Sequence, residues 1–396
     1  MRWVLLLLAL LTQAEEKRKV APLFTVALEH EFPDAAAAFE EARGLLLEHY
    51  YSSSLTEEAL YWAAIEGMLR HISPPGNPEL GKIWQPADYS KVRDSLKGVK
   101  VSVGIKSSFN QKDGSLTVTG VEPTSPADGL LQANDRIMRI DDQPLSGKSV
   151  SDVNSLLQGE IGTKVSLKII RDIKIFEVQL ERSEFHTQQF VCLPVDAKIW
   201  LCELRTITAT TSADVAEQLA LAREANVTGL VLDLRNNVGG VFLEALRTVE
   251  LFLGEKTVML RTLKKADNLQ NYVSTTEEPY DFDIAILANE NTASSAEIIV
   301  AGLQDAGATV VGKKTYGKGV FEQTFALENK FRLKFIIGTM YSPKGKSWQS
   351  KGILPDYAVD QKPAVVKTLR QLPVSQRLSK DVSLITAVKL LRRSHN

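Results

Sequence analysis

The chain has 396 residues, of which 44% are hydrophobic and 24% charged. This length exceeds the usual size of one hydrophobic core and predicts two or three domains, while the composition excludes wholesale disorder. The 47 basic and 48 acidic residues nearly cancel, so no charge excess points to a nucleic-acid partner.

The N-terminus has the pattern of an export signal. One basic residue precedes an apolar run, Trp3 to Leu11, and Ala14 stands before a charged stretch, Glu15 to Lys19. Such an order is typical of a cleaved secretory signal. The alternative is a buried N-terminal helix, since about 20 apolar residues are needed to span a bilayer. We expect residues 1–14 to be removed near Ala14 and the mature protein to be periplasmic or otherwise extracytoplasmic.

Residues 15–97 are predicted to form a helical N-terminal region. Ala35 to Tyr50 is rich in Ala, Glu and Leu, and Thr56 to His71 places its apolar residues on one stripe. Thr56 and the two glutamates that follow it provide a capped start for the second helix. The proline-rich segment from Ser73 to Pro86 predicts an irregular connection.

Residues 98–184 have a different pattern, with short alternating apolar runs separated by turn residues. One helix, Val150 to Leu157, lies among these predicted strands. The order of elements, with Ser125-Pro126-Ala127 and the stretch Gly129 to Ile137, resembles a PDZ domain. An unrelated small β-domain is the alternative.

The PDZ resemblance implies a groove that binds C-terminal tails. Such a domain adds a peptide strand to the edge of its sheet and captures the terminal carboxylate on backbone N–H groups. The expected partners are therefore protein substrates with apolar C-terminal tails. The residues expected to form the loop and the side-chain pocket are Ser102, Val103, Gly104, Ile105, Val153 and Leu157.

Cys192 and Cys202 flank a turn-like segment centred near Ala197. A hairpin there would place the two cysteines opposite each other, and an exported chain meets oxidising conditions. A shift of one residue in the register would turn them to opposite faces and leave two thiols. The sequence therefore leaves the disulfide open.

Residues 185–362 are predicted to form an α/β core, because apolar strands feed helices along this stretch. The strand Thr228–Leu234 leads through a glycine-bearing turn into a helix. The strand Ile284–Ala288 leads through a polar turn into the helix Ser295–Ala306. Residues 363–396 are predicted to form a C-terminal helical region.

Two residues in this core are candidates for chemistry. Ser294 lies at a strand-to-helix turn, where negative charge that develops on a substrate would face a helix N-terminus. Ser294 and Glu297 also match a capping box, so a purely structural N-cap is the alternative. Lys318 follows 24 residues later between Gly317 and Gly319, on backbone that can approach a neighbour closely. Most lysines, however, are solvated surface groups.

A serine nucleophile needs a base. None of the five histidines lies in the α/β stretches, and His186 is the one near a domain junction. This distribution weakens a Ser-His-Asp interpretation without excluding it, since triads assemble from distant sequence. A neutral Lys318 would serve instead, taking the Ser294 proton and later passing it to the leaving amine.

Together these segments resemble the carboxyl-terminal processing proteases, Ser-Lys peptidases with an inserted PDZ domain. The resemblance implies a multidomain α/β fold with a crotonase-like core and serine endopeptidase activity, with Ser294 as nucleophile and Lys318 as base. It implies an oxyanion hole formed by backbone N–H groups of Gly239 or Gly240 and of Ser295. Dimers built by the terminal helices are also common in the family. The segments that carry the match are 229–240, 294–297, 303–305, 315–319, 342–346 and 352–356.

One position departs from the family pattern. The family commonly has a glutamine four residues after the lysine, whereas this chain has Glu322 there and Gln323 one residue later. A one-residue bulge would return Gln323 to the role of orienting Lys318. An ionised Glu322 beside Lys318 would instead favour the protonated lysine and oppose base function. We expect Gln323 to be the partner.

Two other functions stay open. One is a tail-binding protein that does not cleave, and the other is a crotonase-like acyl-CoA enzyme, which the export signal and the PDZ segment disfavour. No cluster of Cys, His and carboxylates has the spacing of metal ligands, so neither a metal nor an organic cofactor is expected. The sequence names no substrate, and an activator or adaptor protein stays open.

Overall fold

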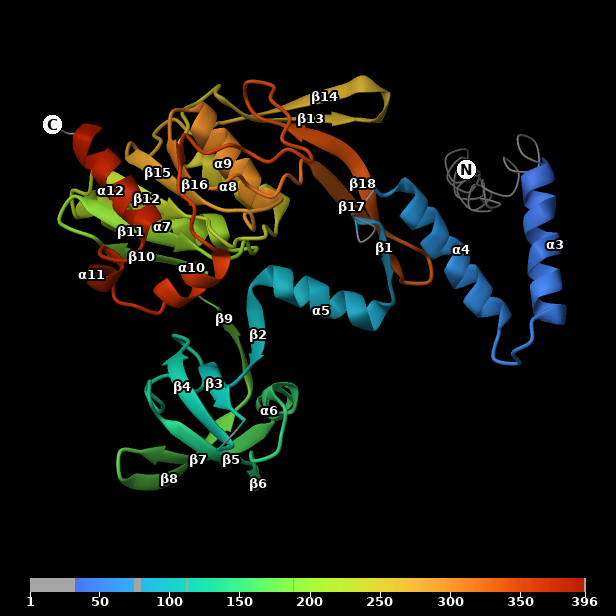
Figure 1. The fold of residues 1–396 in the computed structure, drawn as a ribbon, viewed down its shortest axis with the longest axis horizontal. Coiled ribbons are helices and arrows are strands. Elements are labelled where there is room, and N and C mark those ends of the chain that lie inside the picture. The colour runs from blue at the N-terminus through green and yellow to red at the C-terminus, as the bar shows by residue number, and fades with distance from the viewer. Residues whose placement is uncertain (1–32, 75–79, 112, 188, 395–396) are drawn as a thin grey trace, which may run out of the picture. The chain divides into compact units, whose positions relative to one another are not determined.

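The computed structural model describes residues 33–74, 80–111, 113–187 and 189–394, so the expected export signal lies outside the described residues. The chain divides into two compact units, Met1–Lys82 and Ile83–Asn396, and each is described by itself. Within the described ranges, every helix is too short or too polar to span a bilayer. The multidomain α/β organisation predicted from the sequence is confirmed (Figure 1).

The described part of the first unit contains the helices α3 (Pro33–His49) and α4 (Glu57–Ile72), as the sequence predicts. The Thr56 side chain caps α4 by accepting a hydrogen bond of 3.1 Å from the Ala59 N–H. A third helix, α5 (Pro86–Lys97), belongs to the second unit. The helical region expected over residues 15–97 is therefore divided after Lys82.

The PDZ-like domain is an antiparallel sheet in the order β3-β4-β5-β7-β8, and β3 forms one edge. Alternate residues of these strands face a core that also includes Val153 of the helix. The short strands β2 (Val99–Ser102) and β9 (Ser183–His186) pair with each other where the chain enters and leaves the domain. Its other elements are β3 (Ile105–Asn110), β4 (Ser115–Val121), β5 (Arg136–Ile140), β6 (Gln143–Pro144), α6 (Val150–Leu157), β7 (Lys164–Arg171) and β8 (Lys174–Glu181).

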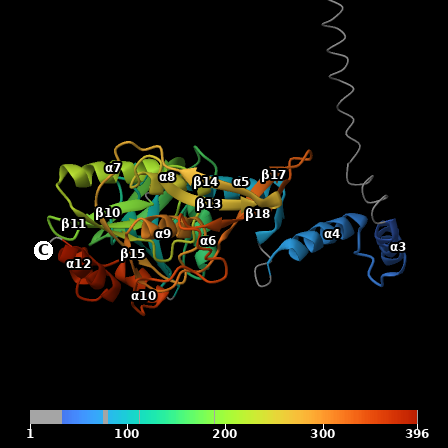
Figure 2. The ribbon, with the colours of Figure 1, turned by 90° about the horizontal axis from the view of Figure 1, so that it is seen from above.

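The core is a six-stranded sheet in the order β10-β11-β12-β15-β16-β19, parallel from β11 onward. Leu230 and Leu232 pack on α7, α8 and α9, while Val231 between them packs on α12. Figure 2 shows α7 and α8 above the strands and α12 below them. The elements are β10 (Phe190–Pro194), β11 (Ile199–Leu204), α7 (Thr211–Glu224), β12 (Gly229–Asp233), α8 (Phe242–Glu250), β15 (Asp283–Ala288), α9 (Ser295–Asp305), β16 (Thr309–Gly312), β19 (Tyr357–Ala358) and α12 (Val382–Ser394).

A second sheet, in the order β1-β18-β13-β14 with β17 paired to β18, was not anticipated from the sequence. Its hairpin β17–β18 follows Lys318 directly and so fixes the direction in which the chain leaves that residue. Its strands are β1 (Lys82–Trp84), β13 (Val258–Lys264), β14 (Asn268–Val273), β17 (Val320–Ala326) and β18 (Arg332–Tyr341), with the short helix η2 (Lys265–Asp267) between β13 and β14. Helices α10 (Pro363–Leu369) and α11 (Val374–Arg377) precede α12.

The open question about the cysteines is settled by the register of the β10–β11 hairpin. Cys192 lies directly opposite Cys202, and the two form a disulfide. Both side chains therefore point to the same face of the sheet, and the one-residue shift that would separate them does not occur.

Candidate active site

Ser294 lies in a strained turn at the start of α9. The strand β15 ends at Ala288, and after a short polar loop the chain reaches Ser294 with φ 59° and ψ −126°. A residue with a Cβ atom adopts such a conformation at a cost of about 1–3 kcal/mol, and strain of this kind concentrates at functional sites. The residue is half-buried. The turn thus presents a serine side chain at a helix N-terminus, where the sequence places it.

A single buried carboxylate joins the two candidate residues. Glu297 is fully buried, and its Oε2 accepts hydrogen bonds from the N–H groups of Ser294 (2.9 Å) and Lys318 (2.8 Å). Its Oε1 accepts from the Thr315 hydroxyl (2.6 Å) and the Gly317 N–H (2.8 Å). The backbones of Ser294 and Lys318, far apart in sequence, therefore meet at the same oxygen atom.

The sequence pattern predicts a capping role for Glu297 but not its bridge to Lys318. The signal was present, because the Ser-x-x-Glu pattern already required the Glu297 side chain to fold back towards Ser294. The tertiary contact with the Lys318 loop could not be read from it. Burial raises the pKa of the Glu297 carboxyl, while the hydrogen bonds from Thr315, Gly317, Lys318 and Ser294 oppose that rise.

Further contacts hold the Lys318 loop in place. The Tyr316 N–H donates to the Thr292 carbonyl (2.9 Å), which fixes the loop against the turn before Ser294. On its other side, the Trp348 indole N–H donates to the Lys318 carbonyl (3.2 Å). Gly317 has φ 97°, and a Cβ there would lie 2.7 Å from the Gly352 nitrogen, so only glycine fits this approach.

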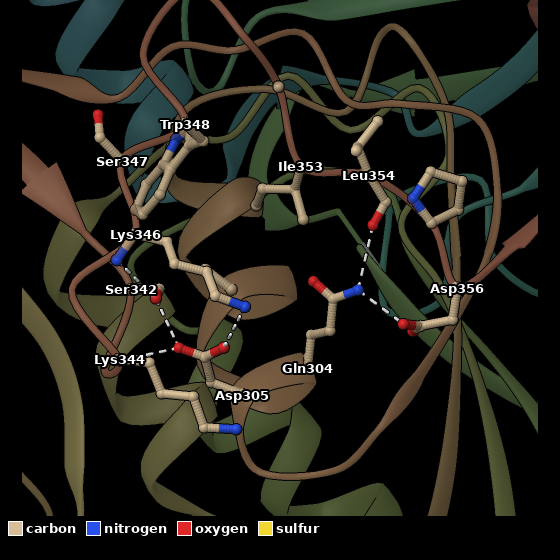
Figure 3. Close-up of a pocket in the computed structure, with 13 residues that line it drawn as sticks. Gln304, Asp305, Ser342, Lys344, Lys346, Ser347, Trp348, Ile353, Leu354 and Asp356 are labelled. Atoms are coloured by element: carbon tan, nitrogen blue, oxygen red, sulfur yellow. Dashed lines mark hydrogen bonds and ion pairs between the residues drawn. The ribbon is translucent and has the colours of Figure 1, made fainter.

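Trp348 also lines a cavity of about 450 Å³ near the end of α9 (Figure 3). Its polar groups satisfy one another: Asp305 accepts from the Ser342 hydroxyl and the Lys344 N–H, and Gln304 donates to the Leu354 carbonyl. Neither Ser294 nor Lys318 lines this cavity. We therefore regard it as part of the framework behind the loop and not as the reaction site.

The Lys318 side chain is paired with Glu322, in contrast to the expectation. The Lys318 Nζ lies 2.8 Å from Glu322 Oε1, whereas Gln323 is exposed on the opposite face of β17. The hairpin does contain a bulge, since Phe321 faces Gly338 while Glu322 faces Ile336. The extra residue is therefore in β18 and not in β17, so it cannot bring Gln323 round to Lys318. The expected partner was wrong, and Glu322 takes its place.

The glycine loop, residues 235–240 after β12, is held in place by buried ion pairs. Arg235 is 1% exposed and makes hydrogen bonds of 2.7 to 2.9 Å with both Asp233 and Asp381. Burial alone would raise the pKa of the Asp233 carboxyl, but Arg235 and Arg370 hold it well below its usual range. The strand that leads into the loop is thereby tied to the segment before α12.

The glycine loop also contacts the Ser294 turn directly. The Ala293 N–H donates to the Asn237 carbonyl (2.9 Å). Gly239 has φ 92°, and a Cβ there would lie 2.8 Å from the Ala293 carbonyl oxygen and 2.9 Å from the Ser295 nitrogen. The close approach of the two loops therefore requires glycine at this position.

The expected oxyanion donors lie together but are engaged with the protein itself. The Gly239 N–H donates to Asn237 Oδ1 (2.8 Å), and the Gly240 N–H donates to the Ser295 hydroxyl (2.6 Å). Ser295 is the first residue of α9, a position where the backbone N–H has no acceptor within the helix. The backbone N–H groups of Gly239, Gly240 and Ser295 thus all lie at the Ser294 turn.

In the PDZ-like domain the structure separates the six expected binding residues. Ser102, Gly104, Ile105 and Leu157 line a cavity beside the free edge of β3. Val103 and Val153 are fully buried in the domain core and do not line it. For Val153 the expected place in the side-chain pocket was wrong, because the side chains of α6 that face the cavity include Asn154, one position after Val153. Val103 was expected in the carboxylate-binding loop, which acts through backbone N–H groups, so that expectation stays a prediction.

Among the described residues, no group of three or more His, Cys, Asp or Glu side chains is placed to hold a metal ion. The candidate site therefore consists of Ser294, Lys318, Glu297 and the surrounding backbone N–H groups.

Comparison with known proteins identifies two domain families and several related proteases. Residues 198–359 match the model of peptidase family S41, and residues 117–171 match that of the PDZ domain. A CtpA-like serine protease of Staphylococcus aureus is 28% identical over 326 residues, which are 81% of this chain and 64% of the relative. That of Staphylococcus saprophyticus is 26% identical over 342 residues, 85% of this chain and 68% of the relative. The chain thus spans about two thirds of the length of these relatives.

Among solved structures, an S41 protease from Bacteroides fragilis shares the fold with a TM-score of 0.56 at 16% sequence identity. The match covers 88% of this chain and 96% of that one. The family resemblance drawn from the sequence is confirmed by the two domain matches and by the staphylococcal relatives.

Replacing Glu297 by Gln is expected to destabilise the protein. The amide keeps the shape of the side chain but turns one acceptor into a donor, which would face N–H or O–H groups that also donate. Each buried donor left unpaired costs about 1–3 kcal/mol. Urea unfolding followed by circular dichroism measures the change. The exposed Glu255→Gln is the matched control, and a Glu297→Gln midpoint equal to that of wild type would contradict the bridging role.

Proposed function

Because residues 198–359 match peptidase family S41 and residues 117–171 match a PDZ domain, we propose that the chain is an exported serine endopeptidase with a Ser294–Lys318 dyad. One observation carries the proposal: Ser294, in a strained turn, and Lys318 both donate their backbone N–H groups to Glu297 Oε2. A capping serine does not need a positive φ, nor does it need a lysine loop fixed to the same carboxylate.

In the proposed reaction the Ser294 hydroxyl attacks the carbonyl carbon of the scissile peptide bond. Its proton passes to the neutral amine of Lys318, and a C–O bond forms as the carbonyl becomes an oxyanion. Lys318 then gives the proton to the leaving amine as the C–N bond breaks. Water hydrolyses the acyl-enzyme by the same route, with Lys318 again as the base.

The backbone N–H groups of Gly240 and Ser295 are the proposed donors to the oxyanion. The Gly240 N–H is held by the Ser295 hydroxyl, so it must exchange that acceptor for the substrate oxygen. This exchange needs little motion, because Gly240 and Ser295 already lie in contact at the Ser294 turn. Backbone donors of this kind stabilise the charge that develops in the transition state.

The PDZ domain is proposed to select substrates by their C-terminal tails. The edge of β3 is free to pair with an added strand, and Gly104 supplies the left-handed turn (φ 81°) at its start. Leu157 and Ile105 offer apolar surface beside that edge. An apolar tail with a free carboxylate fits this arrangement.

Export is proposed from the N-terminal signal pattern, and the disulfide between Cys192 and Cys202 is consistent with it. Disulfides persist in oxidising compartments and are rare in the cytosol.

A second candidate is a tail-binding protein that does not cleave. The observation in its favour is the contact of Lys318 Nζ with Glu322 Oε1, which engages the amine that would have to accept the serine proton. The activity measurements below distinguish the two.

Replacing Ser294 by Ala is expected to lower casein cleavage by about four orders of magnitude or more while the protein stays folded, because the nucleophile is lost. Ser295→Ala keeps its backbone N–H and should retain cleavage. Gel electrophoresis of digests, with circular dichroism of each variant, provides the measurement. Full activity in Ser294→Ala would assign the nucleophile elsewhere, and an inactive wild type would favour the tail-binding candidate.

Lys318→Arg is expected to be inactive, and wild-type kcat/KM should rise with pH between about pH 5 and 10, since only a deprotonated amine accepts the serine proton. Arginine keeps the charge but is not deprotonated in proteins. The exposed Lys314→Arg, in the same loop, is the matched control. If a histidine were the base, His186→Ala would remove activity while Lys318→Arg kept a substantial part of it.

Tail binding can be measured by calorimetry with the full chain carrying Ser294→Ala, which prevents cleavage. A peptide that ends in apolar residues with a free carboxylate is expected to bind, and its C-terminal amide to bind about tenfold or more weakly. The reason is that the amide lacks the charge that the backbone N–H groups of the loop at Gly104 would capture. Equal affinities would contradict carboxylate recognition.

A further inference from the structure

Glu322 is shared between two lysines. Its Oε1 lies 2.8 Å from Lys318 Nζ and 3.2 Å from Lys334 Nζ. Both ammonium groups contact the same oxygen atom. The distance between the two Nζ atoms is therefore no greater than the sum of the two contact distances. The side chains are 20% (Lys318), 12% (Glu322) and 24% (Lys334) exposed, so water screens these charges only in part.

Lys334 is also held from another direction. Its Nζ lies 5.5 Å from the centroid of the Trp84 ring, a distance at which the face of an indole attracts a cation. Lys334 is on β18, two residues before Ile336, which pairs with Glu322 across the hairpin. The ammonium of Lys334 is therefore fixed between a carboxylate and an aromatic face.

These contacts resolve the conflict that Glu322 creates for the proposed reaction. Alone, the carboxylate would stabilise the charged form of Lys318 and withhold the base. Lys334 supplies a second positive charge on the same oxygen. It neutralises Glu322 when Lys318 is neutral, and it repels the proton when Lys318 is charged.

On the basis of the proposed function, we infer that Lys334 is a positioning residue for the reaction. By pairing with Glu322, Lys334 allows Lys318 to release a proton to solvent and become the base. Glu322 keeps its second role, which is to hold the Lys318 side chain in one place. The pair Glu322–Lys334 thus acts on Lys318 as an oriented, nearly neutral hydrogen-bonding group.

Other titratable groups near the cluster lie on the neighbouring elements. Glu297 on α9 contacts the Lys318 backbone, Tyr316 lies in the Lys318 loop, and Lys264 of β13 lies 5.9 Å from the Phe321 ring beside Glu322. None of these is altered by a change at Lys334. A change in the pH dependence of activity in a Lys334 variant can therefore be assigned to the loss of the Lys334 charge.

The test is the pH dependence of kcat/KM for a fluorogenic peptide, measured with the full chain. Lys334→Gln leaves Glu322 without its second cation, so the pH of half-maximal activity should rise. Glu322→Gln should lower it by about as much, and the double variant should return towards wild type. Lys334→Arg keeps the charge and should keep the wild-type midpoint. Lys389→Gln, on the exposed side of α12, is the matched control.

A structural role alone would give a different pattern. Lys334→Gln would then lower kcat/KM at every pH without moving the midpoint, and the double variant would be worse than either single one. That result would overturn the inference and leave the proposed function standing. If wild type shows no Ser294-dependent cleavage at any pH, the proposed function fails.

The premise of the inference, that Lys334 favours the neutral amine of Lys318, can be tested without cleavage by chemical modification. Acetic anhydride reacts with the neutral amine, so the pH dependence of Lys318 acetylation, measured by mass spectrometry, reports its protonation without cleavage. A midpoint for Lys318 that rises in Lys334→Gln and falls in Glu322→Gln supports the inference. Midpoints that do not move overturn it.

Discussion

The carboxylate of Glu297 is the interaction on which the rest of the site depends. It is fully buried and accepts four hydrogen bonds, from Ser294, Thr315, Gly317 and Lys318. A helix N-terminus and a loop from a distant part of the chain are joined through it. Because a buried acceptor with several donors is expensive to break, the relative position of the two loops is set before any substrate arrives.

A second polar centre supports the other side of the site. Arg235 and its partners Asp233 and Asp381 link the strand before the glycine loop to the segment that leads into α12. Removing one member would leave a buried charge unpaired, which is more damaging than replacing the whole network. The C-terminal helices thus do more than cover a face of the sheet, since they also hold the strand from which the proposed oxyanion donors follow.

The Lys318 side chain faces a compromise between orientation and protonation. A charged partner such as Glu322 positions an amine firmly but favours its protonated form. A second cation on the same carboxylate oxygen, as Lys334 is, would relieve the second effect and keep the first. A carboxylate at position 322, where the resemblance leads one to expect an amide, is therefore compatible with the proposed role of Lys318 only when the residues of β18 are considered.

The sequence by itself determined the PDZ-like stretch, the α/β stretch that follows it and the helices and strands around Ser294, but it did not reveal the second sheet. Apolar periodicity located the strand before Ser294 and the helix after it, and the glycines at 239 and 317 marked the close approaches. These are local properties, fixed by side chains within a few residues of one another. The tertiary structure decided which residues meet. It placed the β18 bulge opposite Glu322, aligned Cys192 with Cys202, and brought Lys334 to the site, because pairing register and contacts between distant strands are set by packing and not by local pattern.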